Sequence, residues 1–182
     1  MEDLSLHILD LVENAIAAKA NKIEILIQEE PREDRLVIEI KDDGMGMDQE
    51  MSQKATDPFF TTRSSRRVGL GLSLMAQAAQ EAGGRLRIES ELEKGTKVMA
   101  TFQYKHIDRK PLGDVVETMA TLLLGNPELQ IFYIHQKDGK SYVLSSQMLK
   151  ERFKNQSITH PKVIQWLRKH LREGLAQIGV QG

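Results

Sequence analysis

The chain has 182 residues, of which 40% are hydrophobic and 28% charged, and it contains no cysteine. This is the composition of a soluble globular protein, and the lack of thiols excludes disulfides and thiolate metal sites. No apolar run reaches the roughly 18 residues that cross a bilayer, and the acidic N-terminus is unlike a secretory signal. We therefore expect a cytoplasmic protein that does not contact a membrane.

Charge is unevenly distributed along the chain. Residues 1–104 carry 13 Lys and Arg against 19 Asp and Glu, a net of −6, whereas residues 105–182 carry 12 against 7, a net of +5. The two halves can attract each other, the basic half can meet an acidic partner, or the surface is simply uneven and solvated. An excess this small is weak support for nucleic-acid binding.

The first half of the chain has the pattern of a mixed α and β domain. Helical spacing of apolar residues predicts helices over 3–20 and 71–82. Alternating apolar residues predict strands over 22–28, 35–41, 86–90 and 97–104. The stretch 47–68 is expected to be rich in loops. Helices packed on one face of a mixed sheet fit this order, so the predicted fold class is α+β, a two-layer α/β sandwich.

A boundary is predicted at 106–111, which divides the chain into units 1–104 and 105–182. The second unit is expected to have the order α-β-β-α. Its predicted elements are a helix over 112–124, a hairpin of 129–135 and 141–144, a short helix from Ser145 or Ser146 to about 153, and a helix over Pro161–Gln177.

Two polar side chains face the same way on the first predicted helix. Asp10 and Asn14 are four residues apart and therefore share a helix face. Burying such groups unpaired costs on the order of 1–3 kcal/mol each. A bound Mg²⁺ would explain them, because an Asn amide oxygen is a hard neutral ligand. A plain amphipathic helix also explains this block when it is taken alone.

A second block, Asp42-Asp-Gly44-Met-Gly46, ends a predicted strand. A carboxylate there can accept a hydrogen bond from the exocyclic amine of adenine and would repel the carbonyl of guanine. A charged hydrogen bond of this kind contributes on the order of 1.5–3 kcal/mol. The glycines allow positive φ and a close approach of the backbone to a ligand. An ordinary Asp-Gly turn is the rival interpretation, and the blocks on either side argue against it.

A third block is the string Asp57-Pro-Phe-Phe-Thr-Thr-Arg63. Phe59 and Phe60 can anchor a segment of chain by burying their rings, and the guanidinium of Arg63 can bind phosphate through two parallel hydrogen bonds. A hydrophobic loop with a solvated Arg is the alternative. This string is the most specific of the blocks, and the alternative does not account for the neighbouring blocks.

A fourth block, Gly69-Leu70-Gly71-Leu72, opens the next predicted helix. Free N–H groups and the helix dipole attract phosphate at such a start. The chain has no Walker A pattern, and Leu74 occupies the third glycine position of a Rossmann fingerprint, so both of those nucleotide sites are excluded. A weaker fifth element, Gly95-Thr96, begins a strand.

In this order the blocks resemble the N, G1, F, G2 and G3 boxes of the GHKL superfamily, which includes histidine kinases, mismatch-repair ATPases, gyrase-type enzymes, heat-shock chaperones and anti-sigma kinases. The resemblance covers residues 10 to 96 and implies a Bergerat-type fold that binds ATP or ADP with Mg²⁺. It implies that Asn14 binds the metal and that Asp10 is the catalytic residue. The implied nucleotide-binding residues are Asn14, Asp42, Gly44, Gly46, Phe59, Phe60, Arg63, Gly69, Leu70, Gly71, Leu72 and Thr96.

The sequence departs from the family pattern at three positions. Asp10 stands where hydrolysing members carry a Glu, and its side chain is one methylene shorter. Arg67 occupies a position that is usually Gly, which adds positive charge near the phosphates. Ala17 stands where many histidine kinases have a phosphate-binding Lys. We expect Lys19 or the arginines before Gly69 to make that contact instead.

The predicted function is that of a cytoplasmic, Mg-ATP-binding, histidine-kinase-like regulator that transfers the γ-phosphate to a partner protein in trans. We expect a partner in trans because the chain begins at the N-box helix, without a helical hairpin that carries a phosphoacceptor His. An ATPase switch and a non-catalytic sensor of ATP or ADP are the alternatives. The unit 105–182 is expected to bind the partner, with nucleic acid as a weaker alternative and a homodimer left open. Its basic residues include Lys162, Arg168, Lys169 and Arg172.

Overall fold

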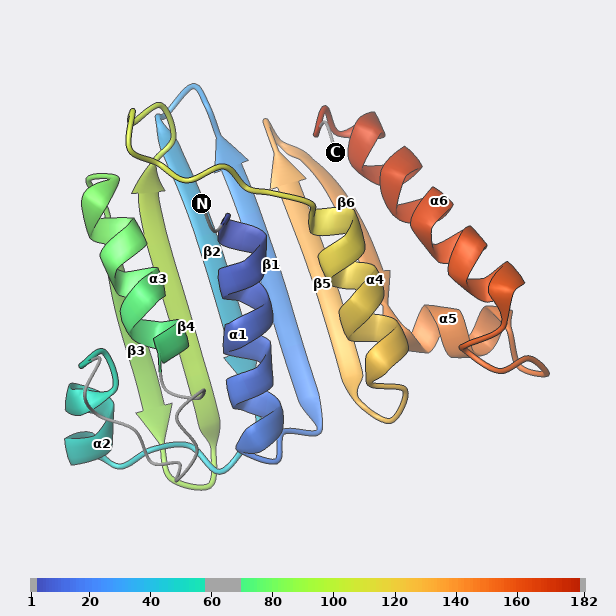
Figure 1. Cartoon of the computed structure of the whole chain (residues 1–182), viewed down its shortest axis with the longest axis horizontal. Coiled ribbons are helices and arrows are strands. Elements are labelled where there is room, and N and C mark those ends of the chain that lie inside the picture. The colour runs from blue at the N-terminus through green and yellow to red at the C-terminus, as the bar shows by residue number, and fades with distance from the viewer. Residues whose placement is uncertain (1–2, 58–69, 181–182) are drawn as a thin grey trace.

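A single six-stranded sheet forms the centre of the computed structural model, which describes residues 3–57 and 70–180 (Figure 1). The strand order is β3-β4-β2-β1-β5-β6. β1 pairs with β5 in parallel, and the other neighbours are antiparallel. The strands are β1 (Lys22–Glu30), β2 (Arg35–Asp42), β3 (Arg85–Glu91), β4 (Gly95–Gln103), β5 (Gln130–Lys137) and β6 (Lys140–Ser145).

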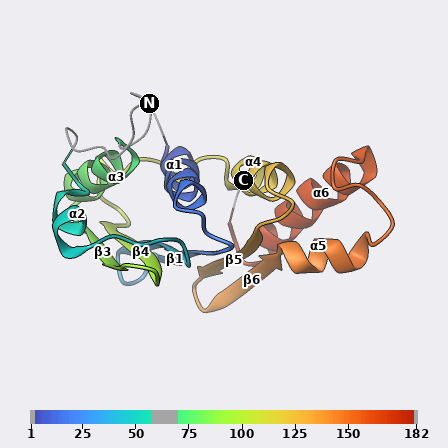
Figure 2. The same ribbon diagram turned by 90° about the horizontal axis from the view of Figure 1, so that it is seen from below.

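Three helices cover one face of this sheet, as Figures 1 and 2 show together: α1 (Leu4–Ala17), α3 (Leu70–Glu81) and α4 (Val115–Gly125). The predicted two-layer α/β sandwich is thereby confirmed. At the end of the sheet next to β6 lie α5 (Ser146–Arg152) and α6 (Pro161–Gln177). Within residues 3–57 and 70–180, no helix has the length and apolar character needed to span a bilayer.

A short helix, α2 (Gln49–Lys54), lies in the stretch where the sequence predicted loops. It has no buried residue, so it lacks the apolar period by which a helix is recognised in a sequence. Local polar contacts hold it instead. The side chain of Asp48 accepts a hydrogen bond from the Met51 N–H at 2.8 Å, and Lys54 pairs with Glu50 one turn earlier.

Buried and half-buried residues alternate along β1, as expected for a strand in a sheet with one fully covered face. In β1, Ile23, Ile25 and Ile27 are buried, while the residues between them are half-buried. The buried side chains pack on the helices and form one continuous core. Ile131 and Tyr133 of β5 belong to this same core, so residues 105–182 extend the sheet of residues 1–104.

The predicted boundary segment crosses the start of α1. The carbonyl oxygens of Pro111 and Leu112 accept hydrogen bonds from the N–H groups of Leu4 and Ser5, both at 2.9 Å. The first N–H groups of a helix have no partner within the helix, and here a segment more than a hundred residues away supplies one. Asp3 is the N-cap. The start of α1 is therefore attached to the chain that leads into α4.

A buried polar network joins β1 to β5 at the end of the sheet where β1 finishes. The Glu29 carboxylate bonds to His135 Nε2 at 2.7 Å, and the hydroxyl of Tyr104 donates to it at 2.9 Å. His135 Nδ1 lies 2.6 Å from the Tyr133 hydroxyl. Burial raises the pKa of Glu29, but the hydrogen bonds from His135 and Tyr104 outweigh burial and leave this pKa below its usual value.

We predict that Glu29→Ala lowers the free energy of unfolding by about 3–5 kcal/mol, because it leaves the buried partners of the carboxylate unsatisfied. Urea unfolding at neutral pH measures this loss. A carboxyl with a lowered folded-state pKa stabilises the fold above its unfolded pKa and loses that contribution as the pH falls. The difference between wild type and variant should therefore narrow in acid.

Glu30→Ala is the matched control for this measurement. Glu30 is the next residue along β1 and makes a more exposed ion pair with Arg35 at 2.7 Å. Losing an ion pair of this kind costs about 1 kcal/mol or less. Equal losses for the two variants would contradict the role of the buried network.

Candidate functional site

The first group of predicted site residues meets where α1 passes the start of α3. Asp10 and Asn14 are half-buried on α1, and Gly71 is buried in the first turn of α3. A Cβ atom on Gly71 would lie 3.0 Å from Asp10 Cβ and 3.4 Å from Asn14 Nδ2. The fold therefore brings these three residues together, and glycine allows the two helices to approach this closely.

The second group lies at the end of β2, where Asp42 is paired across the sheet with Thr96 of β4. The Gly44 N–H donates to Asp42 Oδ1 at 2.8 Å, and Thr96 Oγ1 lies 2.8 Å from Ser90 Oγ. Burial raises the pKa of Asp42, which the N–H groups of Gly44 and Thr96 partly oppose. The result is a small polar cluster that combines a carboxylate with two hydroxyls, and its carboxylate can accept a hydrogen bond from an amine.

The two glycines after Asp42 serve different purposes. Gly46 has a φ of +66°, and a Cβ there would lie 2.0 Å from the carbonyl oxygen of Glu91. Gly44 is not in the positive-φ region, so that expectation is wrong for it. A Cβ on Gly44 would instead lie 2.7 Å from the Ala18 carbonyl oxygen. The close approach that requires glycine at both positions is thus to the protein's own backbone.

Asp43, to which the sequence assigned no role, holds this loop against the end of α1. Its Oδ1 accepts hydrogen bonds from the N–H groups of Asn21 and Lys22, both at 2.8 Å. The Met45 N–H also donates to the Ala18 carbonyl at 2.8 Å. An Asp directly after a strand is a signal for side-chain capping. The capped groups lie 22 and 21 residues earlier, however, so spacing could not identify them.

The remaining predicted residues lie either in the first turn of α3 or outside the described ranges. Leu70, the first residue of α3, is 44% exposed, and Leu72 is partly buried against the core. The predictions for Phe59, Phe60, Arg63 and Gly69 concern residues outside the described ranges.

The sequence model of one family, described as "Histidine kinase-, DNA gyrase B-, and HSP90-like ATPase", matches residues 2–106. That match spans more than half of the chain. The chain belongs to this family. The GHKL-type ATP-binding domain predicted from the sequence blocks is thereby confirmed.

Curated relatives match about half of the chain. A putative sensor protein of Shewanella frigidimarina is 35% identical over 97 residues, which cover 52% of this chain and 15% of that protein. The sensor kinase CckA of Brucella abortus is 36% identical over 84 residues, which cover 46% of this chain and 9% of that protein. Sporulation kinase C of Bacillus subtilis is 33% identical over 88 residues, covering 48% and 20%. The chain thus spans a fifth or less of the length of these relatives.

The fold similarity extends further than the sequence similarity. The Aquifex aeolicus MutL ATPase domain complexed with ADP superimposes with a TM-score of 0.54 at 19% identity, covering 93% of this chain and 88% of that one. The N-terminal domain of a DNA repair protein gives a TM-score of 0.57 at 18% identity, covering 80% and 53%. The fold likeness to MutL therefore continues past residue 106, where the family match ends.

We predict that Gly71→Ala lowers the affinity for ATP roughly tenfold, because the new methyl group forces α3 away from Asp10 and Asn14 and misplaces both. Calorimetric titration with ATP measures the change. Gly125→Ala is the control, since no atom lies within 4 Å of the position its Cβ would take. An unaffected Gly71→Ala variant would show that the contact between α1 and α3 does not position the site.

We predict that Asp42→Asn abolishes ADP binding without lowering thermal stability. The Asn oxygen can still accept from Gly44, but its amide would present a donor to the adenine amine. A carboxyl with a raised folded-state pKa favours the fold below its unfolded pKa and loses that contribution as the pH rises, so removing the charge at neutral pH carries no stability cost. Asp43→Asn, which keeps the Asp42 carboxylate, should retain ADP affinity, and intact binding by Asp42→Asn would contradict the adenine assignment.

Proposed function

We propose that this protein binds Mg-ATP and transfers the γ-phosphate to a partner protein in trans, as a histidine-kinase-like regulator. The observation that supports this most is the position of Asp10 and Asn14 beside Gly71 at the start of α3, in a domain of this ATPase family. The matched segments of the curated relatives CckA and sporulation kinase C, which their names describe as kinases, point in the same direction. ATP is supplied in the cytoplasm, so the proposal places the protein there.

The residues around Asn14 fit a magnesium ion that is held mainly by the nucleotide. Mg²⁺ keeps several waters and usually takes one or two protein oxygens together with substrate phosphates. Over the described ranges, no group of three or more His, Cys, Asp or Glu residues converges on a metal position. The half-buried Asn14 amide would supply the protein ligand, and the bound metal would neutralise phosphate charge.

In the proposed reaction, the bond from the γ-phosphorus to the bridging oxygen breaks and ADP leaves. A new bond forms between the γ-phosphorus and a nucleophile of the partner protein. Asp10 would orient that nucleophile and accept its proton. Because Asp10 is shorter than the Glu of hydrolysing members, we favour transfer to a partner over attack by water, and we keep the ATPase switch and the nucleotide sensor as alternatives.

Incubation with Mg²⁺ and γ-labelled ATP tests the proposal when protein-bound label and free phosphate are followed together. Label on the protein or on an added partner supports phosphotransfer. Free phosphate without bound label indicates an ATPase switch. Saturable binding with neither product indicates a sensor and contradicts phosphotransfer for the partners supplied.

Two variants on α1 assign the roles within the same assay. Asp10→Asn should bind ATP normally and lose turnover by about two to four orders of magnitude. Asn14→Ala should lose the part of the ATP affinity that depends on Mg²⁺ and keep the part measured in EDTA. Glu13→Gln, at an exposed position on the same helix, is the control and should match the wild type. Equal Mg²⁺ dependence in wild type and Asn14→Ala would contradict the metal assignment.

A further inference from the structure

Positive charge is concentrated in one short part of the chain, at the end of the molecule formed by α5 and α6. Residues 146–177, which span both helices, contain seven Lys and Arg and two acidic residues, Glu151 and Glu173, in a protein whose net charge is −1. Periodicity places Lys162, Lys169 and Arg172 along one side of α6. All three are exposed. The opposite side of α6 is buried through Val163, Leu167, Leu171 and Leu175, so the helix cannot turn these charges inward.

We propose that this basic face, defined as Arg152, Lys162, Lys169 and Arg172, docks an acidic surface of a partner protein. The inference rests on the proposed function, for which it supplies the chemistry of the partner. The helices that carry the basic face, α5 and α6, lie at the far end of the sheet from α2 and α3 (Figure 1). A protein docked on the basic face would therefore leave the region of Asp10 and Asn14 uncovered.

Within residues 3–57 and 70–104, no acidic side chain forms an ion pair with the basic face. Among the described residues, the ion pairs of α6 join Arg168 to Glu117 of α4 and Lys169 to Glu173. Both acidic partners lie within residues 105–182. Arg168 Nη2 lies 3.0 Å from Glu117 Oε2, and this two-pronged contact attaches α6 to α4. The Lys169 pair is long, at 3.7 Å, and both of its side chains are well exposed, so it adds little.

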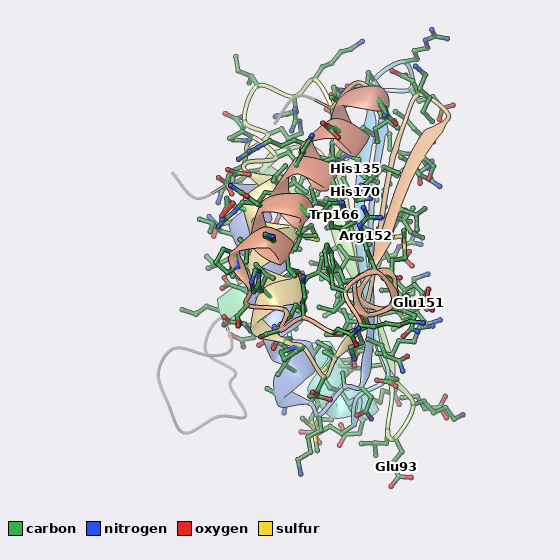
Figure 3. The ribbon with its side chains drawn as sticks, turned by 90° about the vertical axis from the view of Figure 1, so that its right-hand side faces the viewer. Glu93, His135, Glu151, Arg152, Trp166 and His170 are labelled. Carbon is green, nitrogen blue, oxygen red and sulfur yellow. The ribbon has the colours of Figure 1, made fainter. Side chains whose placement is uncertain are left out.

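An aromatic cluster beside the basic face holds Arg152 in place. The Arg152 guanidinium carbon lies 4.7 Å from the centre of the Trp166 ring, and His170 stacks on that ring at 4.5 Å with an interplanar angle of 13°. Phe153 meets it edge-on at 5.4 Å. Figure 3 shows Arg152, Trp166 and His170 gathered between α5 and α6. Because a cation stacked on an indole is held in one position, Arg152 is presented at lower entropic cost.

The same cluster argues against nucleic acid as the partner. Proteins that bind single strands offer open aromatic rings on which bases stack, whereas Trp166 is already in contact with Arg152, Phe153 and His170. A long polyanion would also extend along a molecule whose first 104 residues carry a net charge of −6. A compact acidic patch on a protein meets the basic face without that repulsion.

The experiment measures binding of a fluorescein-labelled oligoglutamate peptide to the full chain by polarisation, at low and at physiological salt. In the test variant, Lys162→Glu, Lys169→Glu and Arg172→Glu are combined. We expect its affinity for the peptide to fall roughly tenfold or more, since each reversal removes an exposed attraction and adds a repulsion. Carbodiimide cross-linking of the bound peptide should map to Lys162 or Lys169.

The control variant combines Arg32→Glu, Arg85→Glu and Arg87→Glu, which changes the net charge equally at exposed positions of the first half. It should keep its affinity for the peptide. An equal loss in both variants overturns the inference, because net charge and not the basic face would then decide binding. Tighter binding of a DNA duplex than of the peptide, lost in the test variant, overturns it in favour of nucleic acid.

Both variants are also titrated with ADP, which separates this inference from the proposed function. Unchanged ADP affinity in the test variant shows that the fold and the nucleotide site are intact, so a loss of peptide binding is local to α6. If peptide binding follows the prediction while γ-phosphate is never transferred, the docking surface stands and the phosphotransfer proposal fails. If transfer to a partner occurs equally well with the test variant, the basic face is not the docking surface.

Discussion

The position of α1 is the constraint on which the rest of the site depends. This helix carries Asp10 and Asn14, and tertiary contacts attach it at both ends. At its start, Pro111 and Leu112 accept the first helical N–H groups. At its end, the Ala18 carbonyl accepts from Met45 in the loop that follows Asp42. The second attachment ties the proposed metal ligand to the proposed adenine acceptor through one short stretch of hydrogen-bonded backbone.

The first attachment also links α1 to the later part of the chain. The segment that caps α1 is also the connection to α4, β5 and β6. The later part of the chain therefore shares the sheet and core of the ATP-binding domain. Its strand β5 pairs with β1, and Glu29 and His135 join the two strands through a buried hydrogen bond of 2.7 Å. The C-terminal elements are therefore joined to the sheet that supports α1 by packed and hydrogen-bonded groups.

Asp42 illustrates the conflict between stability and binding in this site. Burial raises its pKa, which means that the fold disfavours the charge that the adenine amine would recognise. The N–H groups of Gly44 and Thr96 reduce this conflict without removing it. Gly44 donates to one oxygen of this carboxylate. A carboxylate has about four acceptor positions, so it can still accept a hydrogen bond from a ligand.

The sequence by itself determined the fold class, nearly all of the helices and strands, and the family, because these follow from apolar periodicity and from ordered short motifs. It missed α2, which has no buried face and so no periodic signal. Only the tertiary structure showed that Gly71 lies against Asn14, that Asp43 caps Asn21 and Lys22, and that the segment at Pro111 caps α1. The physical reason is that each of these contacts joins residues far apart in the chain, and their pairing depends on how strands and helices pack, not on any local preference.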